Sequence, residues 1–537
     1  MKFIQTFRYK FFFRKTRHYC RRYEQLMSSG QNRFVINMTR ELSLLDFDKN
    51  ERIPKWALGD LAYKNINLSI KQYILRRIDI RTLNISLMLA SDEDNPVPIT
   101  MGLPPHWIRH LKSKGLPLNN LRCTLSWQCK SMLILGYGIL RTLKISFFQY
   151  SQTKDQRILN NISKGFDLFV NLTNNNIPST SATNGQTIID WFLTKYSPKR
   201  NVMIDFNGKV EMYKHDALIF SLGSYFFPLK GIKSRVKFFF WSLLSGFVAL
   251  VYLIRGRWAF AFMHDELVLN YHYSFLEQSC RPDQVYFHNS GWFNRPLWTY
   301  THEKNNGKIC LYFYSTNNFQ FLEPDQTRAT YFGWELMNWP HYIVWNNNQK
   351  NMIEALALKP NTFDVVGHIW FLDNQTENQS LDKIDVAVFD VNAIRPTYYQ
   401  SLGAPVELYT PSKMTHFIKS ISKICCAHNL TLGLKQKREP SYVNSKYYLN
   451  EIKKLSNQNK LIEIDFNQSA VKIIKNSRFV ICSPFTSPAI IAKQMGKGVV
   501  YYDPSGTIQP NDIGRSEITV ISSPEELESH IIKSLKR

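Results

Sequence analysis

One short turn near the C-terminus holds the residues best suited to chemistry. Residues 483–487 read Ser-Pro-Phe-Thr-Ser and follow the apolar residues 479–482. An unbroken apolar run is typical of a parallel strand covered on both faces, and Ser487 followed by proline is typical of a helix start. Backbone N–H groups at a helix start bind anions. We therefore expect Ser483, Thr486 and Ser487 to hold a phosphate group, with helix capping alone as the alternative role of Ser487.

A basic loop is expected at the same edge as this turn. Residues 384–537 alternate strand-like and helix-like runs at the rhythm of a doubly wound sheet. Lys435, Lys437 and Arg438 follow the apolar run 430–434, which places them at the carboxyl end of a strand. Because the carboxyl ends of parallel strands open on one edge, the loop and the turn would bind a diphosphate together. A solvated run of charge is the alternative.

A resemblance rests on two segments, Pro-Phe-Thr-Ser at residues 484–487 and Met-Gly-Lys-Gly-Val-Val-Tyr-Tyr-Asp-Pro at residues 495–504. In these segments the chain resembles bacterial polysaccharide-biosynthesis proteins named for a PFTS motif, which are similar to glycosyltransferases of the GT-B type. The resemblance implies an α/β fold in which two Rossmann-like domains face a cleft, with the nucleotide sugar on the C-terminal domain. It extends from about residue 285 to the C-terminus and does not place the first half.

The acceptor is expected at strand ends in the preceding half of the chain. Residues 285–289, 309–314, 343–345 and 364–371 are short apolar runs, and each ends in hydroxyl, amide or imidazole groups. Strands that end in such groups are typical of a ligand crevice. The residues that we assign to acceptor binding are His288, Asn289, Ser290 and Arg295.

An attacking acceptor hydroxyl needs a proton acceptor on the N-terminal side of the cleft. His302 has a suitable pKa intrinsically, whereas the pKa of Glu303 or Asp265 would have to be raised by desolvation. Glu303 is favoured among the three, because it follows the Arg-Pro-Leu-Trp sequence at residues 295–298, where a loop would face the cleft.

Charge and composition limit the classes of partner that the protein could bind. The chain has 537 residues, of which 44% are hydrophobic, enough for two or three globular domains. Its net charge of +25 predicts an anionic partner: nucleic acid, a membrane surface or phosphorylated small molecules. The eight cysteines form no disulfide framework, which indicates a reducing compartment. Asp46 and Asp48 have the spacing of a metal-binding pair but follow no Rossmann-like frame, so we expect no metal and no cofactor.

Two segments predict membrane attachment. Residues 1–26 hold eight basic residues and one acid, interleaved with aromatic residues, and contain no apolar run long enough for a signal peptide. Such a segment suits a membrane-surface helix, a single-strand nucleic-acid groove or a solvated basic helix. Residues 238–254 are uncharged and have cations on both sides. For them an interfacial helix ranks first, a core helix second and a membrane span third.

These patterns divide the chain into four parts: a basic aromatic extension at 1–40, an acceptor-side α/β domain at 41–372, a linker at 373–383 and a nucleotide-sugar domain at 384–537. With the resemblance, they predict a metal-independent glycosyltransferase of surface-polysaccharide assembly, for capsule or lipopolysaccharide, at the cytoplasmic face of the inner membrane. Its expected partners are a nucleotide-sugar donor, a glycan or polyprenyl-linked acceptor and an anionic membrane surface, not nucleic acid. A basic RNA- or single-strand-binding protein and a non-catalytic membrane scaffold are the alternatives.

Overall fold

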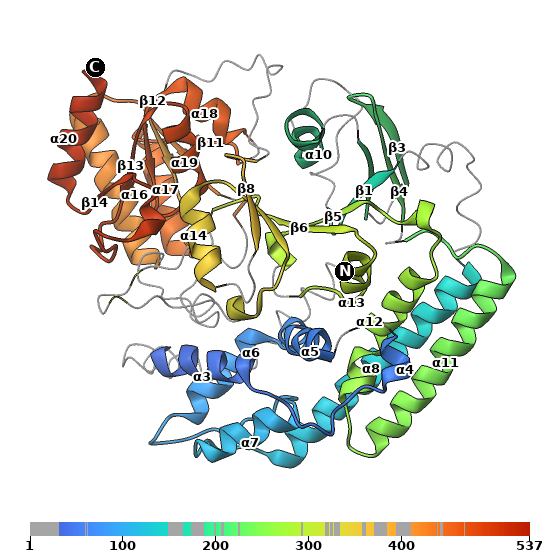
Figure 1. The fold of residues 1–537 in the computed structure, drawn as a ribbon. Helices are drawn as coiled ribbons and strands as arrows, with labels where there is room; N and C mark the ends of the chain where they lie inside the picture. The colour runs from blue at the N-terminus through green and yellow to red at the C-terminus, as the bar shows by residue number, and fades with distance from the viewer. Residues whose placement is uncertain are drawn as a thin grey trace.

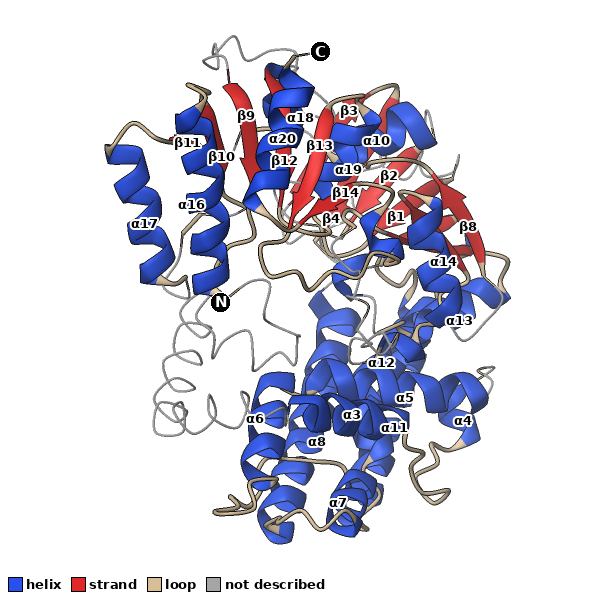
Figure 2. Cartoon of the chain, turned by 90° about the vertical axis from the view of Figure 1, so that its left-hand side faces the viewer, coloured by secondary structure: helices blue, strands red, loops and turns tan. Residues whose placement is uncertain are grey.

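The computed structural model consists of a helical region and two β-sheets (Figure 1), and the helical region lies together on one side of both sheets (Figure 2). The residues that the structure describes are 32–59, 61, 63–148, 165–172, 187–197, 200–205, 209–223, 226–291, 294–316, 322, 326, 333–356, 361–369, 384–393, 410–437, 439–440, 444–466 and 468–536. Three predicted features lie outside them: the linker at 373–383, Arg438, and residues 1–31 of the basic extension.

The C-terminal sheet is parallel and has the strand order β11-β10-β9-β12-β13-β14. Numbered along the chain from β9, this order is 3-2-1-4-5-6, the doubly wound order of dinucleotide-binding sheets. The strands are β9 (Ile384–Phe389), β10 (Leu432–Lys435), β11 (Ile462–Ile464), β12 (Ser477–Cys482), β13 (Gly498–Tyr502) and β14 (Thr519–Ile521). The doubly wound sheet predicted for this part of the chain is confirmed.

Helices cover both faces of the C-terminal sheet. One face packs against α16 (Pro411–Ala427), α17 (Lys446–Asn457) and α20 (Pro524–Leu535), and the other against α18 (Ala470–Asn476) and α19 (Ser487–Gln494). Successive side chains at residues 386–389 of β9 point to opposite faces, which is why this part of the strand is an unbroken apolar run. Thr410 and Ser523 cap α16 and α20, each followed by proline in the first turn.

The first sheet is mixed and has the order β3-β4-β2-β1-β5-β6-β7-β8. Its strands are β1 (Phe166–Phe169), β2 (Asn201–Ile204), β3 (Lys209–Lys214), β4 (Ala217–Leu222), β5 (Gln284–His288), β6 (Lys308–Tyr312), β7 (His341–Val344) and β8 (Thr362–Val365). β3 runs antiparallel to β4, and the other described pairs are parallel. The strand order reverses between β1 and β5, so this sheet has a switch point of its own.

Short helices connect strands of the first sheet. They are α10 (Ile188–Trp191), which Thr187 caps, α13 (Leu297–Lys304), between β5 and β6, and α14 (Asn347–Leu356), between β7 and β8. Because a crossover helix runs back along the sheet, α13 begins near the carboxyl edge and ends near the amino edge.

The first 120 or so described residues are helical, which corrects the prediction of one α/β domain over 41–372. The helices are α3 (Asn32–Leu44), α4 (Lys55–Leu58), α5 (Tyr63–Arg77), α6 (Ile80–Ala90), α7 (Pro105–Ser113) and α8 (Asn120–Leu143). They share one apolar core with α11 (Ile232–Ile254) and α12 (Ala259–Ser274). The α/β part of this half therefore starts at β1, and α11 and α12 join the helical region.

α8 and α11 pack side by side on α12, whose residues are nearly all buried (Figure 1). His264 of α12 lies between Gly138 of α8 and Gly246 of α11. A Cβ atom at position 138 would come within 2.4 Å of His264 Nδ1, and one at position 246 within 3.3 Å of Nε2. Ser245 Oγ lies 3.1 Å from Nε2, and burial lowers the pKa of His264 to about 4. The two glycines therefore allow the three helices to approach one another closely.

The apolar segment predicted at 238–254 is part of α11. Among the described helices, α11 alone is long and apolar enough to cross a membrane, and 33% of its most apolar window is buried. Phe238, Gly246 and Ala249 are among the buried residues, whereas Phe240 and Phe247 are exposed. α11 is therefore a core helix along one face only.

Candidate active site

The turn at residues 483–487 lies at the switch point of the C-terminal sheet. It follows β12, which pairs with β9, and the Ser483 N–H donates to the Phe389 carbonyl at 3.0 Å. The following helix, α19, has Thr486 as its N-cap, one residue earlier than predicted. Phe485 has a φ of 57°, and a Cβ at Gly514 would lie 2.8 Å from its ring. Doubly wound sheets bind ligands at this position.

The three hydroxyls of the turn face the protein, and all three residues are buried. Ser483 Oγ lies 4.0 Å from Met414 Sδ, and Thr486 Oγ1 donates to the Ser483 carbonyl at 2.8 Å. Ser487 Oγ accepts from the Thr316 N–H at 3.1 Å. Each of these contacts braces the turn or its neighbours, and phosphate binding by the three hydroxyls stays a prediction.

The basic loop lies at the same edge, with β9 between it and the turn. Lys435 is the last residue of β10; its Nζ donates to the Phe466 carbonyl at 3.1 Å, and burial lowers the pKa of its ammonium group. Lys437 is exposed, and its N–H donates to Asp390 Oδ1 at 3.1 Å. The predicted sharing of one edge is thus observed for Lys435 and Lys437, and Arg438 lies outside the described residues.

Asp390 also lies at this edge, but it was not among the predicted site residues. It follows β9, is buried, and accepts from the Tyr448 hydroxyl at 2.8 Å as well as from Lys437. Burial raises the pKa of Asp390 to about 6. Its position directly after the apolar run at residues 386–389 was the signal that would have found it.

The carboxyl edge of the first sheet brings together three of the four residues assigned to acceptor binding. His288 ends β5, and its Nε2 lies 3.2 Å from the carbonyl of Asn171, just beyond β1. The Ser290 N–H donates to His288 Nδ1 at 3.3 Å, and Ser290 Oγ lies 2.7 Å from the Tyr314 hydroxyl. Asn289 Oδ1 accepts from the Tyr314 N–H at 3.4 Å. These residues form one hydrogen-bonded group at the switch point between β1 and β5.

The protonation of His288 follows from its partners. Nε2 faces a carbonyl oxygen and therefore carries the ring proton, whereas Nδ1 faces the Ser290 N–H and is the accepting nitrogen. Burial lowers the pKa of His288. A neutral imidazole at the end of a parallel strand is suited to take a proton from a bound hydroxyl group.

The carboxyl edge of the first sheet contacts the C-terminal domain. Thr316, four residues beyond β6, donates its N–H to Ser487 as described above, and its hydroxyl lies 3.2 Å from Ser487 Oγ. Beyond β8, His368 Nδ1 lies 2.6 Å from Gln494 Oε1 of α19. A single apolar cluster contains residues of both domains. The two candidate binding edges are therefore joined at the turn 483–487.

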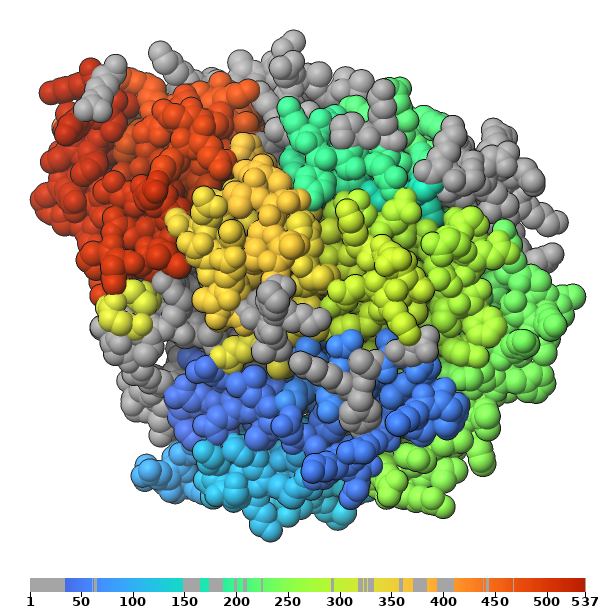
Figure 3. All heavy atoms as spheres, in the orientation of Figure 1, coloured from blue at the N-terminus to red at the C-terminus, as the bar shows by residue number. Residues whose placement is uncertain are grey.

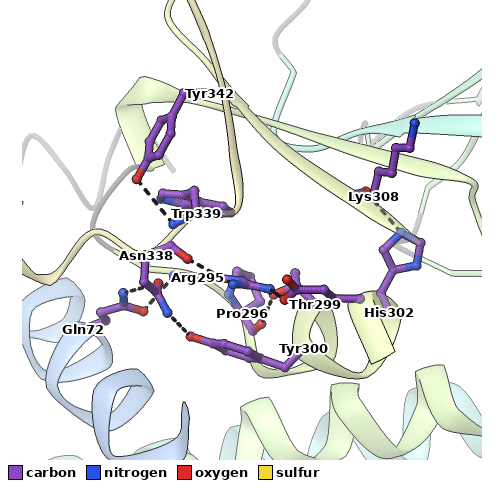
Figure 4. Close-up of polar contacts among 11 residues, drawn as sticks. Gln72, Arg295, Pro296, Thr299, Tyr300, His302, Lys308, Asn338, Trp339 and Tyr342 are labelled. Atoms are coloured by element: carbon purple, nitrogen blue, oxygen red, sulfur yellow. Dashed lines mark hydrogen bonds and ion pairs between the residues drawn. The ribbon is translucent and has the colours of Figure 1, made fainter. Parts of the chain in front are cut away.

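Arg295 is not part of this edge, which corrects its assignment to acceptor binding (Figure 4). Its side chain is 0% exposed and its guanidinium lies 4.0 Å from the centre of the Tyr300 ring. Nε donates to Thr299 Oγ1 at 3.1 Å, and one terminal nitrogen donates to the Asn338 carbonyl at 3.0 Å. The other terminal nitrogen pairs with Glu303. Its backbone N–H donates to Gln72 of α5 at 3.1 Å. Arg295 thus joins the first sheet to the helical region.

His302 and Glu303 lie at the amino edge, which corrects their proposed catalytic roles. His302 Nε2 lies 3.3 Å from the carbonyl of Lys308, the first residue of β6, and Nδ1 lies 2.7 Å from the Tyr273 hydroxyl. Burial lowers the pKa of His302 to about 4. Glu303 is the partner of the buried Arg295. Both residues stabilise the end of α13 that points away from the candidate site.

Asp265, the third predicted proton acceptor, lies on α12 in the helical region. It is buried beside Arg141, with 2.7 Å between the guanidinium and the carboxylate, and burial raises the pKa of Asp265 to about 6.

The carboxylate pair with metal-binding spacing is engaged in ion pairs: Asp46 pairs with Lys71, and Asp48 pairs with Arg109. Within the described part of the chain, no group of three His, Cys, Asp or Glu side chains is arranged to hold a metal ion.

Comparisons with solved structures find remote likenesses. TarM has 13% identity and a TM-score of 0.31, over 50% of this chain and 51% of that one. The UDP-GlcNAc 2-epimerase from Methanocaldococcus jannaschii has 10% identity and a TM-score of 0.36, over 69% and 92%. A variant of the wall teichoic acid polymerase TagF has 12% identity and a TM-score of 0.36, over 76% and 92%. The TM-scores are too low for these likenesses to establish a shared fold.

The family comparison is more informative. A comparison with curated protein sequences finds no match. Residues 239–531, more than half of the chain, match the family described as polysaccharide biosynthesis PFTS motif protein. The match begins within α11, covers the strands from β5 onward and ends within α20 of the C-terminal domain. The chain belongs to the PFTS motif family of polysaccharide biosynthesis proteins.

Proposed function

We propose that the protein is a glycosyltransferase of the GT-B type that moves a sugar from a nucleotide-activated donor onto a surface polysaccharide or a lipid-linked glycan. One observation carries the proposal: the carboxyl edge of the first sheet is hydrogen-bonded to the turn at the switch point of the second, through Thr316 and Ser487. Ligands bound at two such edges would lie next to each other. The family description, polysaccharide biosynthesis, agrees with this chemistry.

We assign the donor to the C-terminal edge. Lys437 and the N-terminal end of α19 supply positive charge and N–H dipoles for a nucleoside diphosphate. Asp390 is a positioning residue there, because it accepts from the Tyr448 hydroxyl and the Lys437 N–H and so fixes the start of the basic loop. No metal is needed for this arrangement to offset the charge of the leaving diphosphate.

We assign the acceptor to the group around His288. The acceptor oxygen forms a bond to the anomeric carbon of the sugar, and the bond from that carbon to the diphosphate oxygen breaks. The leaving diphosphate takes the electron pair, and the acceptor proton passes to His288 Nδ1, which gives up its 3.3 Å hydrogen bond from the Ser290 N–H as the acceptor hydroxyl binds. The Ser290 and Tyr314 hydroxyls, 2.7 Å apart, supply hydrogen bonds that orient the glycan.

A thermal-shift panel of nucleotide sugars tests the proposal. A transferase is stabilised by one donor among many, because a ligand that binds only the folded state raises its stability. Lys437→Ala should weaken that shift, whereas Lys453→Ala, which removes an exposed lysine of α17, should leave it unchanged. Stabilisation by single-stranded RNA with a steep salt dependence would instead support the nucleic-acid alternative. No shift with any nucleotide would support the scaffold alternative.

A further inference from the structure

Two neighbouring helices leave large apolar side chains in solvent. On α8 and the turn that follows it, the exposed residues are Leu121, Leu125, Met132, Leu133, Tyr137, Leu140 and Phe147. On α11 they are Ile232, Val236, Phe240, Leu244, Phe247 and Ile254. In both sets, most successive members are three, four or seven positions apart, so each set lines one side of its helix. We call the two sets together the α8–α11 face.

The exposed sides of α8 and α11 both point away from α12. On α8, Gly138 faces α12, and the exposed Tyr137 and Leu140 lie on the other side of the helix. On α11, Gly246 faces α12, and the exposed Leu244 and Phe247 again lie on the other side. Because α8 and α11 lie next to each other on α12, their outer sides form one layer. Figure 3 shows α11, in light green, at the outer margin of the molecule.

The charged residues on these two helices are all cations. Residues 95–154 and 217–264 contain no Asp or Glu, so both helices and their flanks are free of acids. The helices run in opposite directions, because Gly138 and Gly246 share His264 while the Phe147 ring lies 5.2 Å from the Phe239 ring. Exposed cations stand at both ends of the face: Arg122 and Arg255 at one end, Lys144, Lys233 and Lys237 at the other.

We propose that the α8–α11 face inserts into the surface of a membrane that contains anionic lipids. An apolar stripe bordered by cations matches acyl chains bordered by negative headgroups. A second copy of this chain fits the face less well, because packing two such faces together would bring cations against cations at both ends. The proposal extends the membrane contact from α11 to α8, which the sequence analysis did not include, and does not depend on the transferase activity.

Flotation of the full chain with lipid vesicles tests this contact. The vesicles are phosphatidylcholine alone or phosphatidylcholine with phosphatidylglycerol, each at low and high salt. Three variants are compared with the unmodified chain. They are an α11 variant (Phe240→Ser, Leu244→Ser, Phe247→Ser), an α8 variant (Leu133→Ser, Tyr137→Ser, Leu140→Ser) and a control (Tyr213→Ser, Tyr447→Ser, Ile513→Ser) that removes exposed apolar side chains elsewhere.

The unmodified chain and the control should float with the anionic vesicles and stay bound at high salt, since apolar insertion is not screened. The α8 and α11 variants should each bind at least tenfold more weakly and wash off in salt. Unchanged circular dichroism and melting temperature would show that the variants are folded. Binding by either variant equal to that of the unmodified chain would overturn the proposal. So would a shift from dimer to monomer in the variants without vesicle binding by the unmodified chain, which would identify the face as a self-association surface.

Discussion

Similar residue types occur at the two edges of the first sheet, but they differ in burial and hydrogen bonding. Arg295, just before α13, and His302, at the end of α13 near the amino edge, are buried and bonded to neighbouring side chains and carbonyls. At the carboxyl edge, His288 and Tyr314 are only partly buried, and Ser290 is exposed. Both edges contain a histidine next to a tyrosine hydroxyl or a serine.

This difference shows that residue type does not distinguish a structural from a functional histidine. The position relative to the strands does, because α13 carries its last residues back to the edge where β6 begins. His288 is the last residue of its strand, whereas His302 contacts the first residue of the next one. The following predictions test whether the amino edge serves stability and the carboxyl edge serves transfer.

The largest expected effect is the loss of stability in Arg295→Met. The substitution leaves the Asn338 carbonyl and Thr299 without a buried donor, so the free energy of unfolding should fall by about 3 kcal/mol. Urea denaturation measures it. The matched control is Arg40→Met, which breaks an ion pair with Glu335 in which the Arg40 side chain is 53% exposed, and should cost less than about 1 kcal/mol. Equal losses of unfolding free energy in the two variants would show that the buried contacts of Arg295 stabilise the fold no more than an exposed ion pair does.

The next effect is on transfer, in His288→Ala. If His288 takes the acceptor proton, the rate should fall by about 10²-fold, while the melting temperature changes little. The assay uses the donor found in the thermal-shift panel. A proton acceptor must be unprotonated, and burial lowers the pKa of His288, so activity should persist to lower pH than an ordinary histidine with a pKa of about 6.5 would allow. Full activity in His288→Ala would show that His288 does not take the acceptor proton.

A smaller effect is expected at the contact between the two edges. Ser487→Ala and Thr316→Val each remove one side of the same hydrogen-bonded pair, so their effects on unfolding should not add. A double-mutant cycle should give a coupling of about 1 kcal/mol. Additive effects would mean that the contact between the domains does not depend on this pair. A binding role for the Ser487 hydroxyl would instead appear as a loss of the nucleotide-sugar shift in Ser487→Ala.

The smallest effect is expected for Glu303→Gln. Its side chain is 40% exposed and keeps an oxygen that accepts from Arg295 after the substitution. Transfer should stay near that of the unmodified chain, and stability should fall by less than about 1 kcal/mol. Abolished transfer with unchanged donor binding would return Glu303 to the catalytic site and contradict the contrast between the edges.

The C-terminal domain was predictable because its central strands are buried on both faces. β9 and β12 contain continuous apolar runs, at residues 386–389 and 479–482, so they can be recognised without periodicity. The helical region was not predicted, because a helix such as α8 has apolar residues on its exposed side as well as on its buried side. That distribution removes the one-sided pattern by which an amphipathic helix is recognised.

The location of a residue at the carboxyl edge was predictable where the residue ends a strand or closely follows one. His288, Asn289 and Ser290 belong to that class, and so does Asp390, which was missed. The expectation that a loop at 295–298 would bring Glu303 to the cleft was wrong, because Leu297 begins α13, which carries Glu303 back toward the amino edge. The inward direction of the hydroxyls at 483–487 depends on Met414 and Thr316, which are far away in the sequence.

The packing of His264 between Gly138 and Gly246 has a mechanical consequence. Rotating α8 or α11 about its own axis would bring a side chain against the imidazole, so the two helices keep a fixed orientation on α12. If the α8–α11 face rests on a bilayer as proposed, the two helices would move on it as one rigid body. α12 leads along the chain to β5, which ends at His288. The height of His288 above the bilayer would then be constant, and glycans whose reducing ends are held in the lipid would be selected by length.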